Sequence, residues 1–583
     1  MPLLSAFARP ILLLSGIFAS LSLQAQNAVQ SAPAQSPVLQ TNAQAVSVDV
    51  VVTAPNGDAV QGLGKQDLQL FQDGKAQTID LFEEHTASAV PLLIELPQLP
   101  AQTFTNRPAV PESDAVNILL LDSLNTPEAD QQFVHQQIVN FIHDIRPGTR
   151  MAIFTLNTKL RLLEGFTTDV SLLKQALDRK AAAPGATMAS HTREDDLRDK
   201  EEVAIIAEMT GNADAYNNAA AKAHARTLAD QASNMGGERA SWTLAALQQL
   251  ARSMAAVPGR KNLIWFAGTF PVTVFPNGRN LQTLSDGKDI GVAVRQTANL
   301  LTQARVALYP VAAHGIMVDN TTNADSAGQP LGDDFEKAPN QESAANSANT
   351  AAMQQLAHDT GGKAFYTSNN LSQSIGSAIQ NGSHYYTLVY TPPSVQPDGR
   401  YHKIEVKLTA GKATLSYRRG YYADTVMDAK PASDPLPPLL ARELPASTQI
   451  LFQAHVAPLE PQPAVDAPRA GGNGKLAAPL TRYKVDLVIN PSTVALDLAP
   501  DLTHNGKIEV ALVAYDKAGQ AVNWTGQTLG LGLNPDSYAQ VKRVGIPVHL
   551  QIDLPATGLS LSTGVYDLTA HKAGTLEIPV PAQ

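Results

Sequence analysis

The stretch "VNILLLDSLNTPEAD", residues 116–130, joins a strand, a polar loop and the start of a helix. Its apolar run ends at Asp122, and Pro127 precedes a segment with helical spacing. A continuous apolar strand followed directly by an amphipathic helix is typical of a parallel sheet that is covered by helices on both faces. The apolar face of that helix would carry Phe133, Ile138, Phe141, Ile142 and Ile145.

The same alternation of strands and helices continues as far as residue 367. It predicts a doubly wound, mainly parallel α/β sheet in a domain that spans residues 114–380. A charged, Ala-rich helical insert at 190–240 and an acidic loop at 318–345 would interrupt this domain. The further strand-like runs are "TRMAIFTLN" (149–157), "LRLLEGFT" (160–167), "KNLIWFAG" (261–268), "RVALYPVAA" (305–313) and "KAFYT" (363–367).

Segments with β patterns flank the α/β domain. Residues 45–90 alternate apolar and polar side chains around the turn pairs Asn56-Gly57 and Asp73-Gly74. This unit is too short to be stable alone, so we expect it to complete a sandwich with strands from 384–425. A Pro/Gly-rich linker is predicted at 428–478, interrupted by the strand-like run "TQILFQAHVA" (448–457). Alternating runs at short spacing predict an immunoglobulin-like β-sandwich at 480–583.

The first residues predict export. Arg9 is followed by the apolar run Ile11–Leu23 and by the small Ala25, which together favour a signal peptide at 1–25. The alternative is an uncleaved anchor, although the run is short for a membrane span. Residues 26–44 are rich in Gln, Ala, Ser and Pro and predict a disordered leader. No later run reaches about 18 apolar residues, so no transmembrane segment is expected in the mature chain.

The composition limits the cellular compartments and the classes of function that we expect for this chain. The chain has no cysteine, which excludes disulfides and thiolate zinc sites and favours a bacterial envelope protein, periplasmic or extracellular. The formal charge is −10 and no basic cluster stands out, so nucleic acid is not an expected partner. Neither a His-Glu-x-x-His motif nor a Gly-x-Ser-x-Gly elbow is present, and we expect no enzyme. An envelope hydrolase would need a catalytic set that the spacing does not reveal.

Asp122 stands where an α/β sheet places its ligands. Such sites lie at the carboxyl ends of the strands, and Mg²⁺ prefers carboxylate and hydroxyl oxygens. Ser123 and Thr126 supply hydroxyl groups directly after Asp122. The alternative is structural, because an aspartate here could cap the following helix or accept hydrogen bonds from loop amides.

The stretch resembles the von Willebrand factor A domain. That family has Asp-x-Ser-x-Ser after its first strand, a Thr from a Gly-containing loop and a second Asp after its fourth strand. Together they hold a metal ion that binds a carboxylate of the partner. Asp122 and Thr126 match this pattern, and Thr187 in "PGATMAS" takes the Thr position. Leu124 and Ala267 replace the middle Ser and the second Asp. The resemblance implies a degenerate site for Mg²⁺ or another divalent cation, or no cofactor at all.

The flanking phrases extend the resemblance over residues 45–425. "VDVVVTAPNGDAVQGLGKQDLQLF" and "HYYTLVYTPP" are similar to exported von Willebrand factor A-related proteins of Acidobacteria. This implies a non-enzymatic, adhesion-type module that binds a protein or envelope polymer through loops 122–127, 185–190 and 267–275. The alternative is a structural envelope scaffold in which the C-terminal sandwich makes the contacts.

Overall fold

The computed structural model describes most of the chain between residues 45 and 580. The predicted signal peptide, disordered leader and acidic loop, together with Thr187, lie outside the described residues. The described ranges are 45–86, 99–108, 110, 115–145, 148–182, 219–270, 288–312, 350–366, 375–376, 379–380, 382–392, 400–409, 411–423, 435–464, 467–555 and 559–580.

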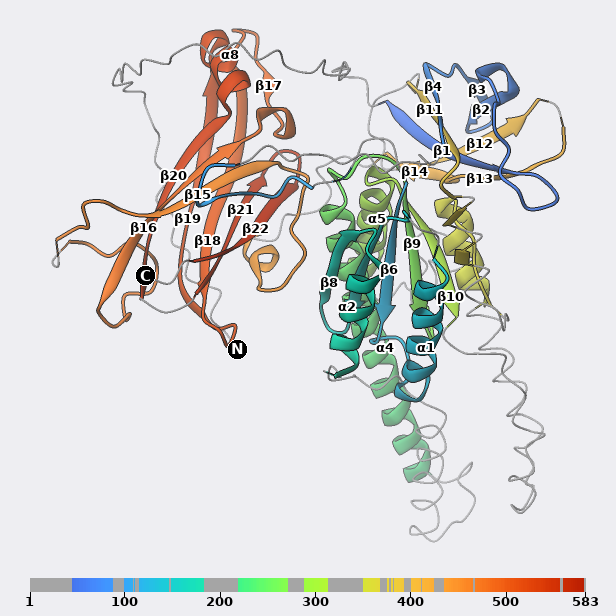
Figure 1. The fold of residues 1–583 in the computed structure, drawn as a ribbon, viewed down its shortest axis with the longest axis horizontal. Helices are drawn as coiled ribbons and strands as arrows, with labels where there is room; N and C mark the ends of the chain where they lie inside the picture. Colours follow the sequence, from blue (N-terminus) through green and yellow to red (C-terminus); the bar gives the residue numbers. More distant parts are fainter. Residues whose placement is uncertain are drawn as a thin grey trace.

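The α/β domain is built on one five-stranded sheet (Figure 1). Strand β6, which contains the apolar run before Asp122, lies in the middle of this sheet. Strands β10, β9, β6 and β7 are parallel, and β8 pairs with β7 in the antiparallel sense. In spatial order the strands are β10 (Val306–Ala312), β9 (Lys261–Ala267), β6 (Val116–Asp122), β7 (Met151–Leu156) and β8 (Leu160–Thr167).

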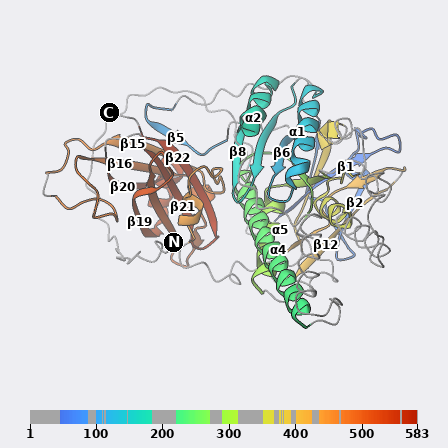
Figure 2. The same cartoon turned by 90° about the horizontal axis from the view of Figure 1, so that it is seen from below.

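Helices cover both faces of this sheet (Figure 2). They are α1 (Glu128–His143), α2 (Val170–Ala182), α4 (Ala219–Ser253) and α5 (Lys288–Gln303). Alternate side chains of β6 enter two different cores. Ile118 and Leu120 share a core with α4 and α5, whereas Leu119 and Leu121 share a core with α1 and α2. Because both faces are buried, the strand is apolar at nearly every position.

Helix α4 corrects the boundary of the predicted insert. The insert was expected to end at residue 240, but one helix runs from Ala219 to Ser253. Leu244, Leu247 and Leu250 on this helix are buried in the sheet core, so the Ala-rich segment before them continues a core helix. The N-terminal part of α4 extends beyond the sheet at the end where the parallel strands finish (Figure 1).

The first sandwich combines strands from both sides of the α/β domain. Val48 and Val50 of one sheet pack with Ile404 and Val406 of the other. One sheet contains β13 (Thr414–Ser416), β1 (Val46–Thr53), β11 (Tyr385–Tyr390) and β4 (Leu81–His85). The other contains β14 (Gly420–Tyr422), β12 (Tyr401–Leu408), β2 (Leu68–Gln72) and β3 (Lys75–Gln77), and a 3₁₀ turn, η1 (Lys65–Asp67), precedes β2.

A second sandwich forms the C-terminal part of the chain, with Val485 and Leu550 of one sheet facing Val510 and Leu561 of the other. One sheet contains β20 (Ile546–Pro555), β16 (Leu480–Ile489), β15 (Phe452–Pro458) and β5 (Thr103–Thr105). The other contains β17 (Asp497–Leu498), β18 (His504–Tyr515), β21 (Ser560–Asp567), β22 (Lys572–Pro579) and β19 (Ala521–Leu533), which pairs with β18. Three short helices accompany them: η4 (Pro437–Leu440), η5 (Pro491–Thr493) and α8 (Pro535–Val544).

The linker predicted at 428–478 was expected to be interrupted by the strand-like run 448–457, and a strand forms there. Strand β15 lies inside it and pairs with β16 and with β5 from the connector before the α/β domain. Asn106 is buried and fixes this crossing, since its Nδ2 donates to the carbonyl oxygens of Ser447 and Ile450 at 2.9 and 2.8 Å. Buried side chains alternate with more exposed ones from Ile450 to Val456, as the strand-like run indicated, whereas the pairing with β5 was not predicted.

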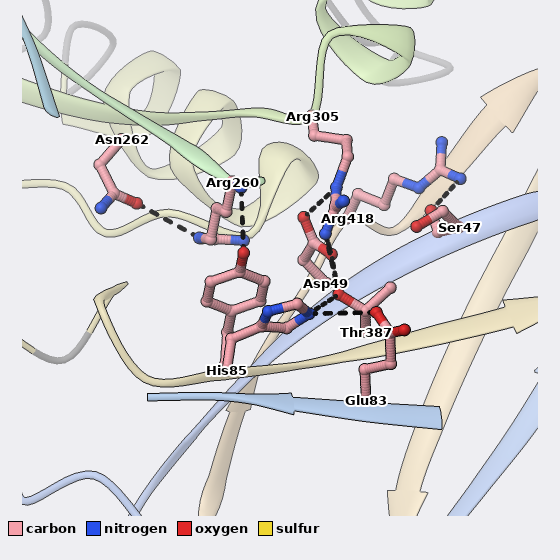
Figure 3. Close-up of polar contacts among 10 residues, drawn as sticks. Ser47, Asp49, Glu83, His85, Arg260, Asn262, Arg305, Thr387 and Arg418 are labelled. Carbon is pink, nitrogen blue, oxygen red and sulfur yellow. Dashed lines mark hydrogen bonds and ion pairs between the residues drawn. The ribbon is translucent and has the colours of Figure 1, made fainter. Parts of the chain in front are cut away.

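An ion pair attaches the first sandwich to the amino-terminal edge of the α/β sheet (Figure 3). Arg305 follows helix α5, and its Nε donates to Asp49 Oδ2 on β1 at 2.9 Å. Its Nη2 donates to the other Asp49 oxygen and, at 2.8 Å, to Thr387 Oγ1 on β11. Arg305 has a φ of +55°, at a helix end where glycine is the usual residue. An arginine is retained there, at a cost of about 1 kcal/mol, because glycine could not make the pair.

The pair controls the ionisation of Asp49. Burial alone would raise the pKa of this carboxyl, but the adjacent Arg305 guanidinium outweighs burial and holds the pKa below its ordinary value of 3.8. A lowered folded-state pKa stabilises the protein above the unfolded value and loses this effect as the pH falls through the folded value.

We therefore predict that Asp49→Asn lowers the free energy of unfolding by roughly 3–5 kcal/mol at pH 7, because it leaves Arg305 buried without its counter-charge. The difference from wild type should shrink as the pH falls below 3.8. Urea unfolding at pH 7 and at pH 3 measures it. Glu405→Gln, which removes an exposed pair with Lys407, is the control and should change stability by under about 1 kcal/mol. A difference for Asp49→Asn that is independent of pH would contradict the account.

Candidate functional site

The carboxylate of Asp122 is enclosed at the carboxyl end of β6, and the residue is 2% exposed. Its Oδ1 accepts a hydrogen bond from the backbone N–H of Asn125 at 2.9 Å. Its Oδ2 accepts from Asn125 Nδ2 at 2.7 Å and from the indole Nε1 of Trp265 at 2.9 Å. Three N–H donors of the protein itself therefore occupy both carboxylate oxygens.

The strand register explains why Trp265 reaches Asp122. Trp265 on β9 pairs with Leu120 on β6, and the side chain of Asp122, two residues later, lies on the same face of the sheet. Phe270 packs edge-to-face on the indole ring, with ring centroids 4.8 Å apart. The indole is therefore held in place by the core while its N–H points at the carboxylate.

Thr126 ties the loop after β6 to the loop after β9. Its Oγ1 donates to the backbone carbonyl oxygen of Asp122 and accepts from the Gly268 N–H at 3.1 Å. The Thr269 N–H donates to the Asn125 carbonyl oxygen at 2.9 Å. A Cβ atom at Gly268 would lie 2.7 Å from Pro127 Cδ, so only glycine fits this approach. The two loops form one packed unit.

Burial raises the pKa of the Asp122 carboxyl to about 6, although the hydrogen bonds from Asn125 and Trp265 act in the opposite direction. The N–H donors of Asn125 and Trp265 thus stabilise the ionised Asp122 carboxylate, whereas burial alone would favour the protonated form.

The described part of this site does not fit a divalent cation. Both Asp122 oxygens are engaged, and the Thr126 hydroxyl both donates and accepts. Leu124 and Ala267, which replace the two missing ligands, are buried in the apolar core. No group of three or more His, Asp or Glu residues that could hold a metal occurs in the described ranges. Because Thr187 lies outside those ranges, the cation site of Asp122, Thr126 and Thr187 stays a prediction.

The geometry agrees with part of the structural alternative. Asp122 accepts from a loop amide, as expected, but it does not cap the helix, because Pro127 is the N-cap of α1 and makes no side-chain capping bond. Of the loops predicted to surround the site, 185–190 lies outside the described residues and 267–275 is described only as far as Phe270.

Arg239 is a site residue that the sequence did not indicate. It lies on α4 one turn before Thr243, whose Oγ1 donates to the Arg239 carbonyl oxygen at 2.8 Å and accepts from Asn125 Nδ2 at 2.9 Å. The Arg239 Nε and Nη1 atoms are buried and have no hydrogen-bond partner within the described structure, and the same is true of Asn125 Oδ1. Burial lowers the pKa of Arg239, while the nearby Asp122 carboxylate raises it. In the described structure, a guanidinium with two unbonded nitrogens therefore lies near the Asp122 loop.

Sequence reasoning missed Arg239 because it is more than 100 residues from Asp122 and stands in an Ala/Gly-rich segment. The available signal was weak: a single cation directly before the apolar helical stripe that begins at Trp242.

Comparisons with known proteins give no family assignment. No family model and no curated protein matches the chain. An aerotolerance-related membrane protein from Bacteroides fragilis and the protein BatB from Bacteroides thetaiotaomicron each align with 46% of this chain and 98% of their own, at 11% and 12% identity and TM-scores of 0.24 and 0.22. Three N-terminal domains of the type V pili tip protein Mfa5 from Porphyromonas gingivalis align with 87% of this chain and 78% of their own, at 9% identity and a TM-score of 0.24. Overlaps this loose carry no functional inference.

Within the described ranges, no helix is long and apolar enough to cross a membrane.

We predict that Trp265→Phe lowers the free energy of unfolding by about 1.5–3 kcal/mol, because the ring is largely retained while a hydrogen bond to a buried charged group is lost. Trp242→Phe, at a partly buried position against the same core, is the matched control and should change stability less. Urea unfolding at pH 7 compares the two. Equal effects of the two variants would show that the indole N–H does not anchor Asp122.

Proposed function

We propose that this chain is an exported, non-enzymatic binding module with a von Willebrand factor A-like domain. It would hold an acidic partner, a protein or envelope polymer, at the carboxyl edge of the α/β sheet without a metal ion. The observation that carries the proposal is an Asp122 carboxylate whose two oxygens already accept hydrogen bonds, near an Arg239 whose Nε and Nη1 have no hydrogen-bond partner in the described structure. In the family that the sequence resembles, a metal supplies the positive charge for the partner's carboxylate. Here Arg239 would supply it. Its Nε and Nη1 are buried in the structure, so the side chain would turn toward the partner to donate two parallel hydrogen bonds to a carboxylate.

The arrangement of the domains supports this choice of surface. Arg305 attaches the first sandwich to the amino-terminal edge of the sheet, and the carboxyl edge with the extended helix α4 points the opposite way (Figure 1). The central position of β6, with parallel neighbours on both sides and one antiparallel edge strand, also agrees with the proposed domain type. Export rests on residues 1–25, whose pattern favours a signal peptide and places the module in the bacterial periplasm or outside the cell.

The test is binding of mature protein to an array of Asp- and Glu-containing peptides and acidic polysaccharides, measured by biolayer interferometry. We predict that Arg239→Ala weakens the strongest interaction at least about tenfold, that Arg239→Lys restores part of it, and that EDTA has no effect. Arg295→Ala, on the neighbouring helix α5, is the control and should bind as wild type. Binding that survives both Arg239→Ala and Asp122→Ala, or that EDTA abolishes, would contradict the proposal.

A second candidate function is that of an envelope scaffold, in which the C-terminal sandwich makes the contacts. Buried polar contacts attach this sandwich to the α/β domain: the Thr448 N–H donates to the Arg252 carbonyl oxygen at 2.9 Å, and Thr448 Oγ1 donates to that of Ser253 at 3.0 Å. The end of the sandwich that carries β17 and α8 exposes apolar side chains, Leu502 by 58% and Val544 by 62% (Figure 1).

The two candidates respond to different substitutions. If the scaffold version holds, Leu502→Glu combined with Val544→Glu abolishes partner binding while Arg239→Ala leaves it unchanged. The reverse pattern supports the carboxyl edge of the α/β sheet. Full-length protein is needed for both, because strands β5 and β15 complete the C-terminal sandwich.

A further inference from the structure

A small cavity lies where the first sandwich meets the amino-terminal edge of the α/β sheet. Figure 3 shows several of the residues that line it. Its volume is about 20 Å³, which is room for one occupant of the size of a water molecule. Three guanidinium groups and one carboxylate line it, those of Arg260, Arg305, Arg418 and Asp49. Ser47 and Thr360 also contribute to the wall.

Arg260 is buried without a carboxylate partner in the described structure. The residue is 2% exposed, and its side chain donates only to neutral acceptors. Nε donates to Asn262 Oδ1 at 3.2 Å, and Nη2 donates to the Gly361 carbonyl oxygen at 2.6 Å and to Tyr309 Oη at 3.3 Å. These bonds satisfy donors, and the nearby carboxylate of Asp49, which also acts on Arg260, is bonded to Arg305.

Arg418, which also lines the cavity, likewise has no direct contact with a carboxylate among the described residues. Its Nη2 donates to the Ser47 carbonyl oxygen at 2.6 Å, while its Nε is buried and has no hydrogen-bond partner among the described residues. The ring of Tyr421 lies 5.8 Å from its guanidinium carbon and supplies a weak, uncharged contact. Arg418 therefore has an unsatisfied donor and, among the described residues, shares the single charge of Asp49 with Arg305 and Arg260.

The charged groups around the cavity do not neutralise its three arginines. Asp49 is the carboxylate of the cavity wall, and it is already engaged by Arg305. Lys261 adds a further buried amine near Arg305. Glu83 is half exposed beside His85, and Asp359 accepts from Gln355 and lies near Arg419. Buried positive charge in excess of negative charge is strongly unfavourable. An anion in the cavity would reduce this excess.

We propose that this cavity binds one monatomic halide ion, chloride being the natural occupant, between Arg260, Arg305 and Arg418. A halide matches the space, whereas sulfate and phosphate need several times the volume. It would reduce the excess positive charge of the three guanidiniums and accept the free N–H of Arg418. The ion would thereby stabilise the junction between the first sandwich and the α/β domain. This effect does not depend on partner binding at the opposite edge of the sheet.

Thermal unfolding of the full chain at constant ionic strength tests the proposal, with sodium chloride replaced stepwise by sodium gluconate. The expected result is a saturating rise in Tm of about 2–4 °C with chloride, because a ligand of the folded state stabilises it by mass action. Bromide should reproduce the saturating rise. Sulfate, which is excluded from protein surfaces, should raise the Tm without saturating and by the same amount in wild type and Arg418→Gln. Arg418→Gln should abolish the chloride response, while Arg419→Gln, a neighbour that does not line the cavity, should retain it. Equal Tm values in chloride and gluconate would overturn the proposal.

A crystal grown in sodium bromide gives an answer that does not depend on how the variants fold. An anomalous difference peak among Arg260, Arg305 and Arg418 is expected. A water molecule at that position, with no anomalous signal, would overturn the proposal.

Discussion

The hydrogen bonds that enclose the Asp122 carboxylate set the character of the carboxyl edge of the sheet. Asn125 brings the loop back onto the end of β6, and Trp265 adds a donor from the neighbouring strand β9. The amide of Asn125 also reaches Thr243, which connects the same carboxylate to helix α4. A strand end, a loop and a helix thus meet at one buried charge. Because an unpaired buried carboxylate is strongly unfavourable, each of these contacts constrains the others.

The charged groups at the two edges of the α/β sheet have different partners. At the amino-terminal edge, Arg305 pairs with Asp49 and joins the sheet to a sandwich whose strands come from both sides of the domain. At the carboxyl edge, the Asp122 carboxylate accepts bonds from within the domain, and Arg239 Nε and Nη1 have no hydrogen-bond partner among the described residues. Charge at one edge serves assembly of the chain, and the charge of Arg239 at the other edge is the one we propose for binding.

The sequence predicted the features that depend on local pattern. The apolar run before Asp122 indicated a buried strand, and the spacing after Pro127 indicated a helix; β6 and α1 are both present. The position of Asp122 at a strand end followed from the same pattern. Its partner Trp265 could not be predicted, because the contact depends on the register between β6 and β9. Arg239 was missed for a similar reason, since only the packing of α4 brings it near the loop. A strand-like run within the linker was predicted, but its pairing with β5 was not, because Phe104 and Ala454 are 350 residues apart in sequence.

The most direct test of the anchored carboxylate is thermal unfolding of the mature protein in EDTA, then with Mg²⁺, Mn²⁺ or Ca²⁺, beside an Asp122→Ala variant. A cation bound only by the folded state must raise the Tm. The account predicts that no cation changes the Tm of the wild type and that Asp122→Ala unfolds at a lower temperature in every buffer. A cation-dependent rise in the wild type that disappears in Asp122→Ala would contradict it.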